Sequence, residues 1–153
     1  YSKIESNRTA FLIMGGSEKY SQQAEKLKIK NFFQIDFDFE DDCEEIFLNT
    51  LDVFAHGRKD GETFGLAIAE AMRNSLPIVS HKNVYNNAHI ETIDSGGKVV
   101  GSHRMYTFEL IKLMNLKRYY NQRMNNSRNL YLKNFESRKK IQKIEEIYFE
   151  ASR

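Results

Sequence analysis

Short apolar runs alternate with segments of helical periodicity along most of the chain. The runs are continuous rather than alternating, which is typical of strands covered on both faces of a parallel sheet. The strand candidates are 10–14, 31–36, 51–56, 77–80 and 98–100. Because strands that alternate with helices form βαβ units, the pattern predicts an α/β fold.

Helical patterns separate the strands and fill the C-terminal third of the chain. Ser17 is expected to cap the first helix. The apolar positions expected to be buried in the first two helices are Tyr20, Ala24, Leu27, Ile46, Phe47 and, as a further candidate, Cys43. Beyond Arg104 the pattern predicts three more helices, and the last, over 136–149, carries an apolar stripe of Ile141, Ile144 and Tyr148.

The stretch Gly61–Met72 joins the strand over 51–56 to an apolar helix expected to begin near Phe64 and to stop before Pro77. A strand, a glycine-containing loop and a helix together present main-chain N–H groups and a positive helix end to an anion. Glu62 and Glu70 lie eight positions apart, just over two helical turns. Two acids that bracket an anion site suit a ligand with hydroxyls next to phosphates.

The central stretch resembles the Glu-x7-Glu signature of the group 1, or family 4, retaining glycosyltransferases. The resemblance covers Leu51–Phe54, Glu62–Met72 and Leu76–Ser80. It implies the GT-B architecture of two doubly wound, Rossmann-like α/β domains with parallel sheets and C-terminal helices. Residues 1–153 would then form a single domain, the C-terminal one that binds the nucleotide-sugar, and the N-terminal acceptor domain would be absent from this chain.

The resemblance also implies roles for residues of the central stretch. Glu70 is expected to accept hydrogen bonds from the ribose hydroxyls. Glu62 is expected beside the donor sugar, as the candidate catalytic residue. The residues expected to contact the diphosphate or the sugar, largely through main-chain N–H groups, are Thr63, Phe64, Gly65 and Leu66. Gly65 would let the ligand approach the backbone closely, and Gly65→Val is expected to abolish nucleotide binding while leaving the fold.

Further donor contacts are expected elsewhere in the chain. Gly15 and Gly16 follow the first strand, where they form either a plain turn or part of the donor cleft. The loop over 35–37, with Ile35 and Phe37, is expected against the nucleobase. The alternative is that Phe37 and Phe39 are core residues. Arg58 and Lys59 are candidates for phosphate contacts.

One histidine and a pair of asparagines leave alternatives open. His56 ends a strand below the central loop, where it is either a structural residue or a catalytic one. Asn86 and Asn87 stand where the family usually has two glycines near the donor sugar. Asparagine can adopt the left-handed conformation of such a loop, although less readily than glycine.

Composition excludes several classes of function. A net charge of +2 gives no electrostatic case for a nucleic-acid or membrane partner, and no apolar run reaches the roughly 20 residues of a membrane span. Cys43 is the single cysteine, which excludes an internal disulfide and favours a cytoplasmic setting, with the full-length protein a candidate for peripheral membrane contact. Asp38, Asp41 and Asp42 favour helix capping over a metal site, and the resemblance implies neither metal nor other cofactor.

Together, the residues and the resemblance predict a glycosyltransferase domain that takes a UDP-, GDP- or ADP-linked sugar as donor. The resemblance implies metal-independent transfer, with retention of configuration, to an acceptor glycan, lipid or protein. Family members bind the diphosphate with an Arg and a Lys that lie earlier in the domain, upstream of the residues of this chain. This chain alone is therefore expected to be inactive. The alternatives are a non-catalytic nucleotide-sugar-binding or scaffold domain, and an epimerase or phosphorylase of the same architecture.

Overall fold

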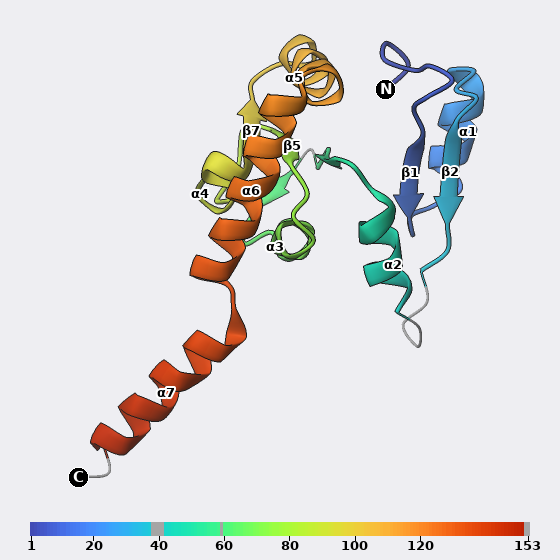
Figure 1. Ribbon diagram of the computed structural model, residues 1–153. Coiled ribbons are helices and arrows are strands. Elements are labelled where there is room, and N and C mark those ends of the chain that lie inside the picture. The colour runs from blue at the N-terminus through green and yellow to red at the C-terminus, as the bar shows by residue number, and fades with distance from the viewer. Residues whose placement is uncertain (38–41, 59, 152–153) are drawn as a thin grey trace.

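The computed structural model describes residues 1–37, 42–58 and 60–151, in which strands and helices alternate (Figure 1). The strands are β1 (Phe11–Met14), β2 (Phe32–Ile35), β3 (Phe54–His56), β4 (Gly61–Glu62), β5 (Ile78–His81), β6 (Asn86–Asn87) and β7 (Gly97–Val100). The helices are α1 (Lys19–Lys26), α2 (Cys43–Thr50), α3 (Leu66–Arg73), α4 (His89–Ile93), α5 (His103–Asn115), α6 (Lys117–Asn134) and α7 (Ser137–Ala151), with a 3-10 helix η1 (Asp94–Gly96) before β7.

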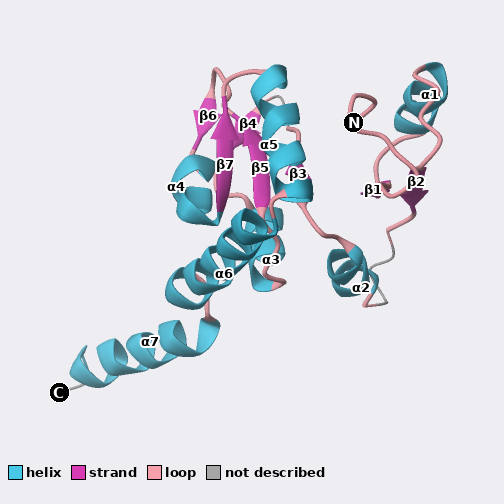
Figure 2. Ribbon diagram, turned by 45° about the horizontal axis from the view of Figure 1, so that its top comes forward, coloured by secondary structure: helices cyan, strands magenta, loops and turns pink. Residues whose placement is uncertain are grey.

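The described strands pair in parallel and fall into three sheets. The main sheet has the order β3-β5-β7, while β1 pairs with β2 and β4 pairs with β6. Both overall views show β1 and β2 apart from the main sheet, with α2 on the path between them (Figures 1 and 2). The α/β class with parallel strands and flanking helices is therefore confirmed, and its strands are divided among separate sheets.

The core lies where α3 meets the main sheet. One cluster joins Ile68 and Met72 of α3 to Ile78 of β5 and Ile93 of α4, and all four side chains are fully buried. A second cluster joins Leu48 of α2, Ala71 of α3 and Leu76. Burying a large aliphatic side chain contributes about 1.5–3 kcal/mol. Helix α3 belongs to both clusters, so its position, and that of the loop before it, is fixed from two sides.

Two elements begin later than the sequence predicts. Helix α3 begins at Leu66 rather than Phe64, because Gly65 adopts a left-handed conformation with φ of 82°. Strand β3 begins at Phe54 rather than Leu51, because the extended residue Leu51 ends α2 and its amide bonds to the carbonyl of Leu48.

The burial of the first two helices differs from the prediction. Tyr20 and Leu27 of the α1 region are 52% and 51% exposed, and Ile46 of α2 is 66% exposed. Ala24 and Leu48 are the buried positions of these helices. Phe47 and Cys43 are half-buried. The prediction that Ser17 caps the first helix is also wrong, since α1 starts after Glu18 without a side-chain cap.

Helix α7 leads away from the rest of the molecule (Figures 1 and 2). Its residues 141–150 are all exposed. The predicted apolar stripe exists, but Ile141, Ile144 and Tyr148 face solvent, at 53%, 52% and 73% exposure. Among the helices of the described residues, none combines the length and hydrophobicity that crossing a bilayer requires.

Candidate functional site

The central loop runs from the end of β3 to the start of α3 and is held in place by β4. Gly61 and Glu62 pair in parallel with Asn86 and Asn87 of β6. Gly61 has φ of 80°, and a Cβ there would collide with the carbonyl of Asn86. The two loops therefore approach as closely as glycine permits.

The β4–β6 pairing corrects the expectation for the asparagine pair. Asn86 and Asn87 form an extended strand instead of a left-handed turn. Among the described residues other than glycine, positive φ values occur at Lys28, Ser75 and Asp94. The asparagines therefore serve as a backbone support for Glu62, a role that does not require glycine. Asn87 also bonds through its side chain to both backbone groups of Asn83.

Glu62 is held by its neighbours on the loop. Its Oε2 accepts a hydrogen bond from Nη1 of Arg58 at 3.2 Å, and its Oε1 accepts one from the amide of Thr63 at 3.2 Å. The Glu62 side chain is 16% exposed. Arg58 also donates to Asp60, so the structure directs this cation toward two carboxylates. Lys59 lies outside the described residues, as do Asp38, Phe39 and Asp41.

His56 lies beneath Glu62 at the end of β3. Its Nε2 is 3.8 Å from Oε2 of Glu62, and its Nδ1 is 2.9 Å from Oγ of Ser80. Tyr106 of α5 donates its hydroxyl to the carbonyls of His56 and Val79. Burial lowers the pKa of His56, the nearby His89 and Arg58 lower it further, and Glu62 opposes them. The pKa of the buried Tyr106 hydroxyl is raised, so it remains a proton donor.

Helix α3 presents its N-terminal amides beside Glu62. The carbonyl of Gly65 accepts from the amides of Ile68 and Ala69. Within the part of the chain that the structure describes, the amides of Gly65, Leu66 and Ala67 have no hydrogen-bond acceptor. Free N–H groups at a helix start attract anions.

The side chains around this helix start are mostly turned outward. Thr63 is exposed, and Phe64 and Leu66 are 57% and 64% exposed. The ring of Phe64 meets that of Phe135 edge to face, with centroids 6.1 Å apart. A Cβ on Gly65 would approach Cδ1 of Ile68 to 3.0 Å and Cγ of Glu62 to 3.2 Å. Because φ is also positive there, the expectation that Gly65→Val leaves the fold is wrong locally.

Glu70 lies on the second turn of α3, among the buried residues Ile68, Ala69 and Ala71. It is half-buried and faces Glu44 of α2. Burial raises the pKa of Glu70, the Glu44 carboxylate raises it further, and Arg73 opposes them. The apolar surroundings predicted for this carboxylate are thus present, and both burial and the Glu44 carboxylate disfavour its charged form.

The remaining predicted donor contacts gather on the β1–β2 sheet. The amide of Gly15 donates to the carbonyl of Ile35 at 2.8 Å, and a Cβ on Gly15 would lie 3.7 Å from that of Phe37. Gly15 and Gly16 have φ of 71° and 87°, as a tight turn requires. Ile35 and Phe37 are 43% and 39% exposed. The structure therefore brings these four residues together at the β1–β2 sheet, whereas Glu62 belongs to the β4–β6 sheet (Figure 2).

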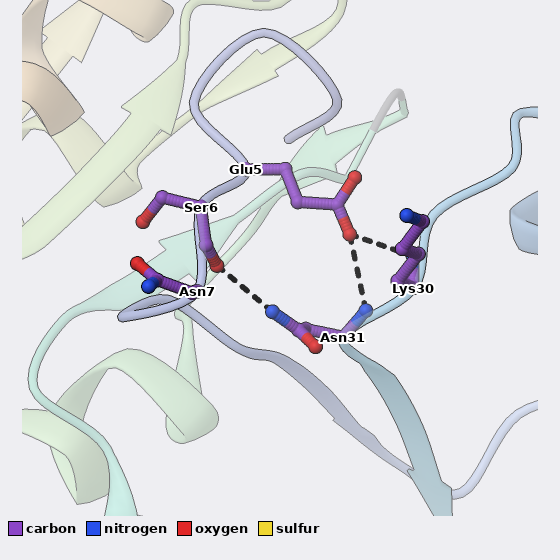
Figure 3. A pocket seen from close by; sticks show the side chains of 5 residues that line it. All are labelled: Glu5, Ser6, Asn7, Lys30 and Asn31. Carbon is purple, nitrogen blue, oxygen red and sulfur yellow. Dashed lines mark hydrogen bonds between the residues drawn. The ribbon is translucent and has the colours of Figure 1, made fainter.

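A pocket of about 390 Å³ near the N-terminus is lined by none of the predicted donor-site residues (Figure 3). Oε1 of Glu5 accepts from the amides of Lys30 at 2.6 Å and Asn31 at 3.0 Å. The side-chain amide of Asn31 donates to the carbonyls of Ser6 and Thr9. These hydrogen bonds hold the start of the chain against the residues that precede β2.

Sequence reasoning missed the partners of His56. Ser80 is fully buried and pairs in register with His56. Both residues lie at the carboxyl ends of apolar strands that neighbour one another in a parallel sheet, and this signal was available in the sequence. The Tyr106 contact spans 50 positions and had no such signal.

The family model for glycosyl transferases group 1 matches residues 1–130, most of the chain. This chain belongs to that family. Its fold is one Rossmann-like half of the GT-B glycosyltransferases, as the resemblance implied. Comparison with curated protein sequences gave no match.

Solved structures with this fold include three glycosyltransferases or relatives. The chain matches Anabaena HepE in complex with UDP-glucose with a TM-score of 0.74 and 18% identity, over 95% of this chain and 42% of that one. It matches a glycosyltransferase from Rickettsia africae with a TM-score of 0.72 and 17% identity, over 97% and 41%. It matches WaaG, a glycosyltransferase involved in lipopolysaccharide biosynthesis, with a TM-score of 0.68 and 18% identity, over 80% of this chain and 34% of that one. The chain spans about two fifths of the length of the first of these structures.

Proposed function

We propose that this chain is the donor-binding half of a glycosyltransferase and binds a nucleotide-diphosphate sugar between Glu62 and Glu70. The observation that carries the proposal is the start of α3. Left-handed Gly65 opens the helix with amides that lack acceptors in the described chain, and in the sequence one carboxylate, Glu62, precedes this start and another, Glu70, follows it. The uridine nucleotide is the first candidate, because the HepE structure with this fold holds UDP-glucose.

Each part of such a ligand has a chemical match. The diphosphate accepts hydrogen bonds from the free amides at the helix start, where the helix dipole also favours negative charge. The ribose hydroxyls donate to Glu70, which forms no ion pair within the described residues, in contrast to the Arg58–Glu62 pair. Hydrogen bonds to a charged group contribute about 1.5–3 kcal/mol each. The donor sugar lies beside Glu62.

The reaction we propose is sugar transfer with retention to an acceptor bound by a second half of the full-length protein. Helix-start amides would stabilise the departing nucleoside diphosphate, since donors aimed at developing charge lower the barrier most. Glu62 would orient the sugar through its hydroxyls, and its own bonds to Arg58 and Thr63 hold it ready. Family membership supports this reaction class.

Calorimetric titration with UDP, GDP and ADP tests the donor site. One nucleotide is expected to bind the wild-type chain, and Glu70→Gln is expected to weaken it by about tenfold or more, the loss of one charged hydrogen bond. Glu145→Gln on the exposed face of α7 is the matched control, because it removes the same charge far from the site. Equal affinity for the two glutamine variants, or no binding of any nucleotide, would overturn the proposal.

A further inference from the structure

His56 is fixed on one side by the main sheet. It is the register partner of Ser80, so both side chains leave the sheet on the same face. Nδ1 of His56 lies 2.9 Å from Oγ of Ser80, which is fully buried. The hydroxyl of Tyr106 fastens the backbone of His56 through its carbonyl. The imidazole therefore has a defined orientation.

The other ring nitrogen faces Glu62. Nε2 lies 3.8 Å from Oε2 of Glu62, and the two side chains are 10% and 16% exposed. That separation is longer than a hydrogen bond but within the range of an ion pair. Catalytic contacts are often this long before a ligand binds. The same Oε2 accepts a hydrogen bond from Nη1 of Arg58 at 3.2 Å, so nitrogen atoms of both His56 and Arg58 lie within 4 Å of this carboxylate oxygen.

We propose that His56 is a positioning residue for Glu62. The Ser80 hydroxyl donates to Nδ1, which places the ring proton on Nε2, and this N–H keeps the Glu62 carboxylate turned toward the donor sugar. The last step rests on the donor site proposed above; the arrangement of Ser80, His56 and Glu62 does not.

The charged and titratable groups around His56 come from several elements and favour the neutral ring. His89 of α4 is fully buried, its ring centroid is 5.8 Å from that of His56, and its Nδ1 has no hydrogen-bond partner among the residues that the structure describes. Arg58 adds positive charge from the loop. Glu62 of β4 is the opposing negative charge, and Tyr106 of α5 faces the backbone. A neutral ring can keep one N–H donor and one acceptor, as the proposal requires.

Nitrogen-15 NMR of the ligand-free chain tests the arrangement directly. The His56 ring is expected to show the Nε2–H tautomer at neutral pH, and Ser80→Ala is expected to shift it toward a mixture of tautomers. Glu62→Gln is expected to lower the pKa of His56, because it removes the attractive charge. An Nδ1–H tautomer, or a His56 titration unaffected by Glu62→Gln, would overturn the proposal.

A pair of variants then tests the consequence for the ligand. His56→Gln can place an amide N–H near the position of Nε2, whereas His56→Asn reaches only the position of Nδ1. Titration with UDP-glucose and UDP is expected to show about tenfold weaker UDP-glucose binding for His56→Asn, unchanged UDP binding, and recovery in His56→Gln.

The two proposals fail in different ways. Equal losses for UDP and UDP-glucose in both variants would indicate a merely structural histidine and overturn the positioning role. A wild-type chain that binds neither compound would count against the proposed donor site in its uridine form. The tautomer and the His56–Glu62 coupling would then still decide whether Ser80 and His56 position the carboxylate.

Discussion

Nδ1 of His56 and Oγ of Ser80 lie 2.9 Å apart because the two residues are paired across neighbouring parallel strands. The pairing sets a titratable ring at the edge of the sheet, directly below the loop that carries Glu62. Ser80 is fully buried and His56 nearly so. The site is therefore built on the rigid sheet as well as on the loop.

The buried ring makes stability depend on pH. The pKa of His56 is lowered in the folded chain from its usual 6.5, so the unfolded chain binds the proton first on acidification. Its contribution to stability is complete above pH 6.5 and is lost as the pH falls through 6.5 and then through the folded pKa. Urea unfolding across this range is expected to show a smaller acid loss for His56→Gln than for wild type. His81, whose pKa is also lowered, contributes equally to the acid loss of the wild type and of the variant. The same pH dependence of the free energy of unfolding in the two proteins would contradict the prediction.

Glu70→Gln is expected to stabilise the chain while weakening nucleotide binding. The Glu70 carboxylate is half-buried and faces Glu44, so its charge is unfavourable in the folded state. Its raised pKa means that the cost is absent at low pH and appears as the pH rises through the folded pKa. We expect a gain of about 0.5 kcal/mol or less at pH 7, the size of a like-charge pair. Thermal unfolding at pH 7 and at pH 4 should show the gain at pH 7 alone, and Glu44→Gln should act in the same direction.

Gly61→Ala is expected to displace the central loop from its pairing with β6. The residue has φ of 80°, and the added Cβ would collide with the carbonyl of Asn86 across the β4–β6 pair. A cost of about 1–3 kcal/mol follows from the strain, together with loss of nucleotide affinity. Gly57→Ala is the matched control on the same loop, because no heavy atom of the described residues beyond its chain neighbours lies within 4 Å of its Cβ position and its φ is not positive. Denaturant unfolding of both variants should separate them, and similar midpoints would refute the argument.

Two isoleucines on neighbouring helices test the core. Ile68 is fully buried between α3 and the main sheet, whereas Ile46 on α2 is 66% exposed. Ile68→Ala is expected to cost about 2–5 kcal/mol, including the cavity left behind. Ile46→Ala should change the free energy of unfolding by about 0.5 kcal/mol or less. A large loss of unfolding free energy in Ile46→Ala would indicate that Ile46 is buried, as the sequence pattern predicted.

The sequence predicts the elements well where the signal is local. The apolar runs over 77–80 and 98–100 became β5 and β7, and the Glu62–Met72 pattern gave the start of α3 to within two residues. The family follows from the same stretch. Local chemistry also explains the late start of α3, since only the backbone angle of Gly65 decides it.

Burial could not be predicted in the same way, because it depends on what lies opposite each helix. Tyr20 and Ile46 have the right period to be core residues, yet β1 and β2 form a separate small sheet that leaves them uncovered. The β4–β6 pairing is similar: each strand has two residues and gives no periodic signal. The support of Glu62 by Asn87 therefore required the structure.

Helix α7 changes what an unfolding experiment on this chain measures. Its residues 141–150 are already exposed to water in the folded state. The heat-capacity change and the denaturant sensitivity of unfolding scale with newly exposed surface. Both quantities should thus be smaller than 153 residues would suggest, and α7 should exchange its amide hydrogens by local opening well before α3 does.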